Sequence, residues 1–258
     1  MKLQDKVAIV TGSSRGIGKA IALAFAREGA VVTIAARTAI ESKLITGTIH
    51  KTADEIRASG GKVLPIKTDV TNVSEVEAMV RKTIEEFKRI DILVNNAATN
   101  HPALLKDMPL KHWDTTIGVN LRGTVVCTKA VLPIMMDQKE GHIINISSIV
   151  ARVIHHEPMT GLAYGVSKAA INRFTRGLAE ELREYRIAVN ALMPDNTDTE
   201  GWSYLNPTVD RSKWQKPEVW GRYAVYVATR DTTAFTGKVL SEEELKKECR
   251  GQIFILDI

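Results

Sequence analysis

One segment near the start of the chain restricts its fold more than any other. A short apolar run, residues 7–10, is followed at once by a glycine-rich stretch from Thr11 to Gly18, and residues 19–28 then have the apolar spacing of a helix. This order of strand, glycine turn and helix is typical of dinucleotide binding. The glycines permit a tight turn, and the helix N-terminus offers N–H groups to a pyrophosphate. A plain strand-to-helix turn is the alternative. The residues that we expect to contact the dinucleotide here are Gly12, Ser14, Arg15, Gly16, Ile17 and Gly18.

Apolar runs and helical patterns alternate along the remainder of the chain. The expected strands cover residues 7–10, 31–36, 62–68, 91–94, 142–148 and 187–192, with a last strand at 252–256, for which 238–240 competes. The expected helices cover 19–28, 52–59, 73–88, about 110–136, a segment around 164–168, 218–229 and a short charged stretch within 241–250. This alternation predicts an α/β fold with one domain over residues 1–258. Its core would be a doubly wound Rossmann sheet of about seven parallel strands with helices on both faces.

The end of the second expected strand indicates which dinucleotide binds. A site for NAD usually has an Asp or Glu there, which accepts hydrogen bonds from the ribose hydroxyls. This chain has Ala36 followed by Arg37, and Arg15 lies in the glycine stretch. Guanidinium groups bind phosphate well, so the two arginines favour the 2′-phosphate of NADP over NAD. Solvent exposure of both arginines is the alternative.

Polar residues also follow the third and fourth expected strands. Asp69 comes at the edge where open α/β sheets bind their ligands, so it is placed to meet an adenine amino group. The same turn contains Thr71 and Ser74, either of which could be a helix N-cap. Two amides at 95–96 can tie neighbouring strands together and leave room for a ribose.

Tyr164 and Lys168 lie four positions apart in a segment of small residues. On a helix such residues share one face, so the phenol and the ammonium can reach the same ligand. A free phenol has a pKa of about 10, and a neighbouring cation lowers this pKa toward the range useful for proton exchange at neutral pH. A surface contact between the two side chains is the alternative.

An asparagine interrupts the apolar pattern of the helix expected at about 110–136. Asn120 lies between Val119 and Leu121, and its amide competes with the backbone hydrogen bonds of the helix. We expect a local distortion of the helix that holds a water molecule. An amide satisfied by a backbone carbonyl is the alternative.

Taken together, these residues resemble the short-chain dehydrogenase/reductase family, of the classical type, over nearly the whole chain. The matching motifs are Thr11-Gly12-(three residues)-Gly16-Ile17-Gly18, Asp69-Val70, Asn95-Asn96-Ala97, Asn120, Ile146-Ser147-Ser148, Tyr164-(three residues)-Lys168 and Pro194. The order and separation of these motifs make the resemblance specific. The segments 38–51, 191–194 and 235–237 are also similar to the hydroxysteroid-dehydrogenase-like branch of the family.

The resemblance implies an oxidoreductase in which hydride passes between a nicotinamide ring and a substrate carbon, so that the cofactor carries the hard chemistry. Tyr164 would exchange a proton with the substrate oxygen, and Lys168 would lower the Tyr164 pKa and bind the nicotinamide ribose. Ser148 would hydrogen-bond the carbonyl or alcohol, and Asn120 would hold a water in a proton relay. The further residues implied to contact the cofactor are Asp69, Val70, Asn96, Ala97, Pro194 and Thr199.

Four features depart from the family pattern. Asp195 stands where the family usually has a glycine after the proline, and Ala98 replaces the glycine that usually ends the fourth-strand motif. The segment from Arg152 to Leu162 is longer than usual, and we expect it to form a wall of the substrate pocket. The usual Asp-Gly-Gly ending is missing, and the charged stretch within 241–250 lies nearby.

Residues 195–217 are expected to form a substrate lid. Aromatic residues gather in and after this segment, at Trp202, Tyr204, Trp214, Trp220, Tyr223 and Tyr226. Trp220 and Tyr223, one turn apart, are expected in a helix core, whereas the first three favour an apolar pocket for a ring or an acyl chain. Packing of the loop onto its own domain is the alternative. His155 and His156 lack the Cys or carboxylate spacing of a metal site, so no metal is predicted.

Composition restricts the partners. The net charge of +5 is spread along the chain, which suits an anionic ligand and does not indicate nucleic acid. The sequence has no run of about eighteen apolar residues and no leader-like start, so we expect no membrane span and no signal peptide. Two cysteines, Cys127 and Cys249, fit a reducing compartment, and we expect a cytoplasmic protein. The resemblance implies a homo-oligomer, a tetramer or a dimer.

The sequence therefore predicts an NADP(H)-dependent dehydrogenase or reductase that acts on a carbonyl or secondary alcohol of an apolar small molecule. An NAD-dependent enzyme of the same fold is the first alternative. A nucleotide-binding scaffold without turnover is the second, and Asp195 keeps it open.

Overall fold

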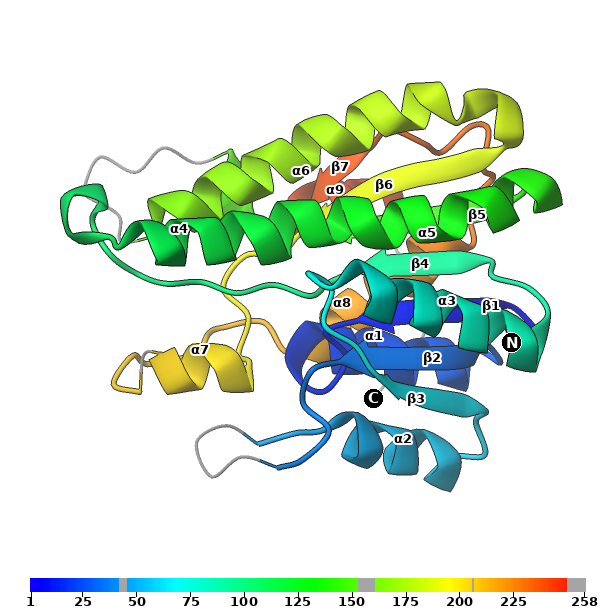
Figure 1. The fold of residues 1–258 in the computed structure, drawn as a ribbon, viewed down its shortest axis with the longest axis horizontal. Helices are drawn as coiled ribbons and strands as arrows, with labels where there is room; N and C mark the ends of the chain where they lie inside the picture. The colour runs from blue at the N-terminus through cyan, green and yellow to red at the C-terminus, as the bar shows by residue number, and fades with distance from the viewer. Residues whose placement is uncertain (42–45, 153–160, 206, 250–258) are drawn as a thin grey trace.

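The sheet of this protein is parallel throughout. The computed structural model describes residues 1–41, 46–152, 161–205 and 207–249. Within them, seven strands pair in the order β3-β2-β1-β4-β5-β6-β7. The strands are β1 (Val7–Thr11), β2 (Val31–Ala36), β3 (Val63–Lys67), β4 (Ile92–Asn95), β5 (Gly141–Ile146), β6 (Ile187–Met193) and β7 (Val239–Ser241). The order reverses between β1 and β4 (Figure 1), and open α/β sheets bind ligands in a crevice at the carboxyl ends of the strands at such a point.

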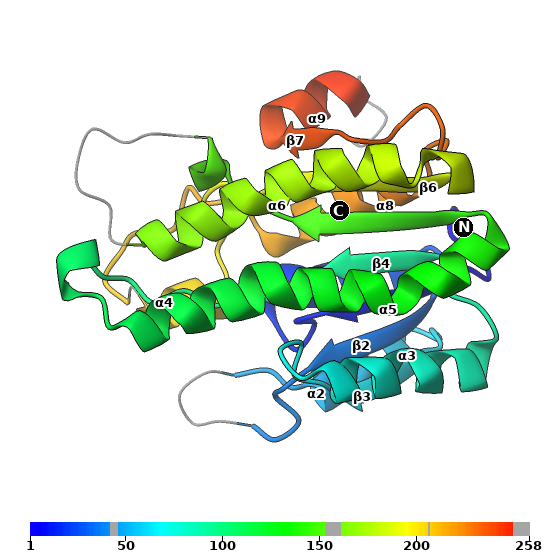
Figure 2. The same cartoon turned by 45° about the horizontal axis from the view of Figure 1, so that its top comes forward.

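Helices cover both faces of this sheet (Figures 1 and 2). The α-helices are α1 (Gly16–Arg27), α2 (Ile49–Ala58), α3 (Val73–Phe87), α4 (Leu110–Ile117), α5 (Gly123–Gln138), α6 (Leu162–Glu181), α7 (Glu200–Leu205), α8 (Pro217–Ala228) and α9 (Glu242–Cys249). Short 3-10 turns are η1 (Leu105–Asp107), η3 (Ile149–Ala151) and η4 (Arg183–Tyr185), and η2 (Gly118–Arg122) is a π-helical turn. Phe25, Ile56 and Trp220 of α1, α2 and α8 pack on one face, and Met79 and Val131 of α3 and α5 pack on the other. The predicted doubly wound α/β fold is confirmed.

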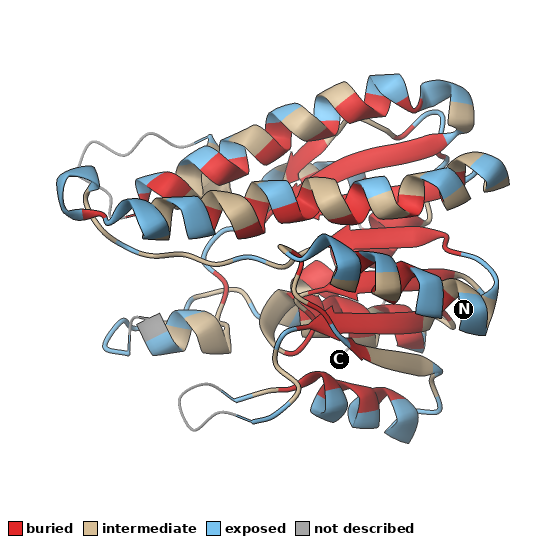
Figure 3. Ribbon diagram, in the orientation of Figure 1, coloured by how far each residue is buried: buried red, intermediate tan, exposed pale blue. Residues whose placement is uncertain are grey.

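Two covered faces explain why the strands read as apolar runs. The strands β1, β4, β5 and β6 are buried at every residue. Most helices are buried along one side, whereas α8 is buried over most of its length (Figure 3). The apolar runs of the sequence therefore located the inner strands to within two residues at either end.

The seventh strand comes from the run that competed at 238–240. The backbone N–H of Lys238 donates to the side-chain oxygen of Asn190 at 3.0 Å, and the Lys238 carbonyl accepts from the Ala191 N–H at 2.8 Å. These bonds bring β7 alongside β6. The run at 252–256, which the sequence favoured, lies outside the described residues.

Two helix starts differ from the predicted ones because of capping side chains. Thr48 caps α2 by accepting the Lys51 N–H at 3.1 Å, so α2 begins earlier than the expected residue 52. The N-cap of α3 is Asn72, not Thr71 or Ser74.

The long helical run Leu110–Gln138 joins α4, η2 and α5. Of the helices in the described ranges, this one is long and apolar enough to cross a membrane by length and composition alone. Its α5 part lies against β4 and β5 (Figure 2). Its buried side chains pack on the sheet, as those of a covering helix do.

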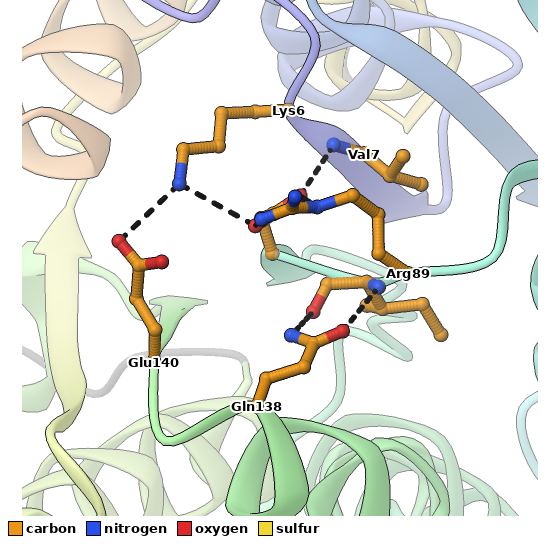
Figure 4. Close-up of polar contacts among 7 residues, drawn as sticks. Lys6, Val7, Arg89, Gln138 and Glu140 are labelled. Atoms are coloured by element: carbon orange, nitrogen blue, oxygen red, sulfur yellow. Dashed lines mark hydrogen bonds and ion pairs between the residues drawn. The ribbon is translucent and has the colours of Figure 1, made fainter.

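A charged network fixes the amino-terminal ends of the strands, opposite the crevice (Figure 4). Asp91 is buried and accepts hydrogen bonds from the Val7 N–H at 2.8 Å and from the guanidinium of Arg89. Lys6 bridges Asp91 and Glu140, with its ammonium 3.5 and 3.2 Å from the two carboxylates. These contacts tie together the segments that enter β1, β4 and β5.

Candidate active site

The glycine turn lies at the carboxyl end of β1, tightly packed against the end of β4. Gly12 and Gly16 have φ angles of +65° and +56°, a conformation that favours glycine. A Cβ on Gly12 would lie 2.8 Å from the Cα of Ala97. A Cβ on Gly18 would collide with the Gly12 carbonyl and the Asn96 amide. The turn therefore requires its glycines, and it presents the N-terminus of α1 to the crevice, as a pyrophosphate site does.

The amides at 95–96 tie the neighbouring strands together, as predicted. The Asn96 side chain donates to the carbonyls of Thr11 and Gly12 at 2.9 and 3.1 Å. The Asn95 amide donates to the Asn145 side-chain oxygen at 2.9 Å, which joins β4 to β5. The side chain of Asn96 is thus engaged with the glycine turn itself.

Three of the predicted cofactor residues direct their side chains into the protein. Ser14 and Val70 are buried, and Ile17 packs against the core formed with α1, α2 and α8. These side chains therefore contribute to the packing around the glycine turn and the end of β3.

Two arginines and one aspartate gather at the far end of the crevice. Arg15 is half-buried. Its guanidinium donates to the Thr38 hydroxyl at 3.3 Å and to the Gly47 carbonyl, in the loop between β2 and α2, at 3.1 Å. Arg37 is exposed at the end of β2. Burial would raise the pKa of Asp69, but two hydrogen bonds from Thr71 and the charge of Arg37 lower that pKa below its usual value. Arg37 and Asp69 are therefore close neighbours at the ends of β2 and β3.

Asn120 lies in the π-helical turn η2, so the helix is distorted as predicted, and its amide also bonds to a backbone carbonyl as in the alternative. Its oxygen accepts the Thr99 N–H at 2.8 Å, and its nitrogen donates to the Thr99 carbonyl at 3.0 Å and to the Ser167 hydroxyl at 3.0 Å. Ser167 in turn donates to the carbonyl of Tyr164 at 2.7 Å. The distortion thus connects the loop after β4 to helix α6.

Ser148, Tyr164 and Lys168 converge at the carboxyl end of β5. Ser148 follows β5, and the other two lie on α6. The Lys168 side chain is 2% exposed, and its ammonium donates to the Ile146 carbonyl at 2.7 Å. That ammonium lies 5.3 Å from the centre of the Tyr164 ring. The spacing argument therefore placed the two side chains correctly, on one face of one helix.

The expected effect of Lys168 on the phenol is not found in the protein alone. Burial raises the pKa of Tyr164 to about 12, and a hydrogen bond with Ser148 lowers it only in part. Burial also lowers the pKa of Lys168 to about 7. Desolvation therefore outweighs any effect of the neighbouring ammonium on the pKa of the phenol.

The loop after β6 closes this end of the site. The Pro194 carbonyl accepts the Ile149 N–H at 2.9 Å and the Ser148 hydroxyl at 3.4 Å. Asp195, which replaces the expected glycine, is exposed, and its carboxylate accepts the Asn196 N–H at 2.8 Å. The Asp195 carboxylate is thus held within its own turn.

Thr199 and Glu200 lie over the first turn of α1. A Cβ on Gly16 would be 3.3 Å from the Thr199 side chain. The Glu200 carboxylate accepts the Gly16 N–H at 2.9 Å. Sequence analysis did not find Glu200, because the contact joins residues 184 positions apart and no local pattern marks it.

The described part of the segment 195–217 contains the short helix α7. Thr197 pairs with Gln215 in a bridge, and the Thr197 hydroxyl accepts the Trp220 indole N–H at 3.1 Å. The two ends of the segment are therefore pinned together and to α8.

The aromatic residues divide as predicted between core and loop. Trp220 and Tyr223 are buried in the core. Trp202 and Trp214 pack edge to face with ring centres 5.3 Å apart, and Trp202 and Tyr204 remain exposed. Most of the segment 152–162, with His155 and His156, lies outside the described residues. In the described ranges, no group of three or more His, Cys, Asp or Glu side chains is placed to hold a metal ion.

Comparisons with known proteins agree with this geometry. The chain matches the short chain dehydrogenase family over residues 6–210. It is 39% identical over 250 residues to hydroxysteroid dehydrogenase-like protein 2 of Danio rerio and 37% identical over 251 residues to the Homo sapiens protein of that name. Each alignment covers 96% of this chain but 59% of the relative, so the chain spans little more than half the length of these relatives. A crystal structure of a short-chain type dehydrogenase/reductase from Mycobacterium marinum is similar, with a TM-score of 0.84 and 33% identity, and the match covers 93% of this chain and 94% of that one.

The fold and the site define an α/β oxidoreductase domain that takes a dinucleotide at the β1–β4 crevice. The chain belongs to the short-chain dehydrogenase/reductase family. Members of this family use nicotinamide dinucleotides. The glycine turn fits such a cofactor, because its backbone is packed so closely that a Cβ at Gly12 or Gly18 would collide with neighbouring atoms.

Proposed function

We propose that this chain transfers hydride between NADP(H) and a carbonyl or secondary alcohol group. The observation that carries the proposal is the convergence of Ser148, Tyr164 and Lys168 at the carboxyl end of β5, on the same edge of the sheet as the glycine turn. The bound nicotinamide supplies or accepts the hydride at the substrate carbon. The residues of the chain then have to bind the substrate oxygen and move one proton.

Tyr164 gives its phenolic proton to the substrate oxygen during reduction and takes a proton back during oxidation. Ser148 holds the same oxygen, since its hydroxyl lies close enough to Tyr164 to lower the phenol pKa. The protein alone leaves that pKa at about 12, so a phenol is the dominant form at neutral pH. This form can donate a proton to a carbonyl oxygen.

Lys168 and Asn120 support this proton transfer. With a pKa of about 7, Lys168 gains and loses a proton readily at neutral pH, beside the Tyr164 ring. We place the nicotinamide ribose next to its ammonium. Asn120, joined to α6 through Ser167, keeps the π-helical turn open for a water that continues the relay.

Charge at the adenosine end supports NADP over NAD. Arg37 is exposed at the end of β2, where an acidic side chain would bind the ribose of NAD. Arg15 lies in the glycine turn, and its Nε has no hydrogen-bond partner among the described residues. The Arg37 guanidinium is exposed to a 2′-phosphate, and Arg15 can join it by giving up its bonds to Thr38 and Gly47. An NAD-dependent enzyme of the same fold is the alternative.

The lid segment 195–217 supports an apolar substrate. Trp202 and Tyr204 are exposed on α7 at the carboxyl side of the sheet, and Trp214 packs on Trp202. The name of the relatives, hydroxysteroid dehydrogenase-like, agrees with a ring alcohol or ketone as the substrate class. We propose an alcohol or ketone on an apolar ring or chain.

Replacement of Tyr164 by Phe tests the chemistry. A panel of cyclic and long-chain ketones is assayed with NADPH, and affinity for NADPH is measured by nicotinamide fluorescence. We expect Tyr164→Phe to lose about 10²- to 10⁴-fold in turnover with unchanged affinity for NADPH. Tyr185→Phe is the matched control, because Tyr185 lies in η4 before the amino end of β6 and should keep full activity. Full turnover by Tyr164→Phe would contradict the proposed role of the phenol. Binding of NADPH without turnover by the wild type on any ketone would favour the scaffold alternative.

A further inference from the structure

The first N–H group of α1 already has an anionic partner. The Glu200 carboxylate accepts the Gly16 N–H at 2.9 Å, across 184 positions of sequence. Glu200 starts α7 in the lid segment 195–217, and Thr199 lies over the same glycine. A carboxylate from the lid therefore occupies the position where a helix N-terminus receives a phosphate.

Helix α1 has no capping side chain of its own at this N-terminus. Arg15 is at its N-cap and makes no capping bond there, and the first turn of α1 contains no acidic residue. By contrast, α2 and α3 are capped by their own Thr48 and Asn72. Glu200 also acts on Arg15, where its charge counteracts the fall in the Arg15 pKa that burial causes. Glu200 thus meets both groups of the glycine turn that attract an anion.

We propose that Glu200 is an internal competitor for the phosphates of the cofactor, which must displace it from the Gly16 N–H. This inference rests on the proposed function and concerns the regulation of the same site. Two anions cannot share one N–H group, and two adjacent negative charges repel each other. Binding of the cofactor therefore releases the start of α7 from α1.

The rest of the lid can remain in place during this exchange. Thr197 is held by Trp220 and by its bridge to Gln215, and Asp198 is paired with Lys216 at 2.9 Å. Beyond these anchors, Thr199 and Glu200 contact the glycine turn, and Glu200 does so through its hydrogen bond to Gly16. Cofactor binding is in this way coupled to the position of α7, which carries the exposed aromatic residues of the proposed substrate pocket. The cofactor is expected to bind before the substrate.

The test uses Glu200→Gln, which removes the charge and keeps the size of the side chain. Dissociation constants for NADPH and for NADH are measured by nicotinamide fluorescence, and the melting temperature is measured without cofactor. We expect Glu200→Gln to bind the preferred cofactor about three- to tenfold more tightly. Without cofactor it should melt about 2 °C lower, because the contact with Gly16 is weakened. These opposite signs separate a competitor from a residue that simply supports the fold.

Glu218→Gln is the matched control, because Glu218 is exposed at the start of α8 and the substitution changes the net charge equally. Its cofactor affinity should stay within about twofold of the wild type. If the wild type binds a cofactor and Glu200→Gln binds it equally or more weakly, this inference is overturned and the proposed function stands. If neither protein binds NADPH or NADH, the proposed function falls together with the inference. Binding by Glu200→Gln alone would support the competitor role in its strongest form.

Discussion

The side-chain amide of Asn120 pairs with both backbone polar groups of Thr99. Its oxygen accepts the Thr99 N–H at 2.8 Å and its nitrogen donates to the Thr99 carbonyl at 3.0 Å. This pairing imitates one rung of a β-ladder, between a π-helical turn and the loop that follows β4. The buried amide of Asn120 therefore holds the loop after β4 against the π-helical turn.

Asn120→Ala removes three hydrogen bonds at a residue that is 1% exposed. We expect the free energy of unfolding to fall by about 2–4 kcal/mol, because the partly buried backbone groups of Thr99 and the Ser167 hydroxyl lose their partners. Urea denaturation measures this change. Asn196→Ala, at an exposed position, is the control and should change the free energy by less than about 0.5 kcal/mol. Equal stability of Asn120→Ala and the wild type would show that the pairing does not hold the loop.

Gly18→Ala tests the packing of the glycine turn. The added Cβ would collide with the Gly12 carbonyl and the Asn96 amide, so β1 and β4 must move apart at the crevice. We expect a loss of about 2–4 kcal/mol in stability and weaker cofactor binding. The matched control is Gly201→Ala on α7, where nothing lies within 4 Å of an added Cβ. A Gly18→Ala protein with native stability and affinity would contradict the observed close packing.

His142 predicts an acid sensitivity of the fold. Burial lowers the pKa of His142 to about 4, although the charges of Glu140 and Asp91 counteract it. An unfolded histidine titrates near about 6.5, so between the two pKa values the unfolded state binds more protons and stability falls as the pH falls. At pH 5 this loss is about 2 kcal/mol.

His142→Leu lacks this titration. We expect the wild type to lose about 2 kcal/mol more than His142→Leu between pH 8 and pH 5, in paired urea titrations. The carboxylates contribute equally to both proteins and cancel in the difference. Parallel losses in the two proteins would mean that His142 becomes protonated in the folded state without cost.

Several features that depend on neighbouring residues in the sequence were predicted correctly. The inner strands were located by their apolar runs, because burial on both faces leaves no alternation to interpret. Asn120 was identified because a polar side chain in an apolar helix must find a partner. The spacing of Tyr164 and Lys168 placed both on one face of α6.

Contacts between distant segments could not be predicted in this way. The seventh strand is joined to β6 at Lys238, whose N–H bonds to the Asn190 side chain, and no local pattern of the run at 238–240 marks this contact. The spacing of Lys168 did not show that its ammonium bonds to the Ile146 carbonyl. Glu200 bonds to Gly16 across 184 positions of sequence, so no local pattern marks the contact.

The central claim is that this site takes NADP(H), and titration with NADPH and with NADH tests it most directly. Nicotinamide fluorescence gives both dissociation constants, for the wild type and for Arg37→Ala, which removes the exposed guanidinium at the end of β2. We predict that the wild type prefers NADPH by about tenfold or more, and that Arg37→Ala loses most of this preference with little change in its affinity for NADH. Equal or tighter binding of NADH by the wild type would contradict the assignment and make the NAD-dependent enzyme the better account.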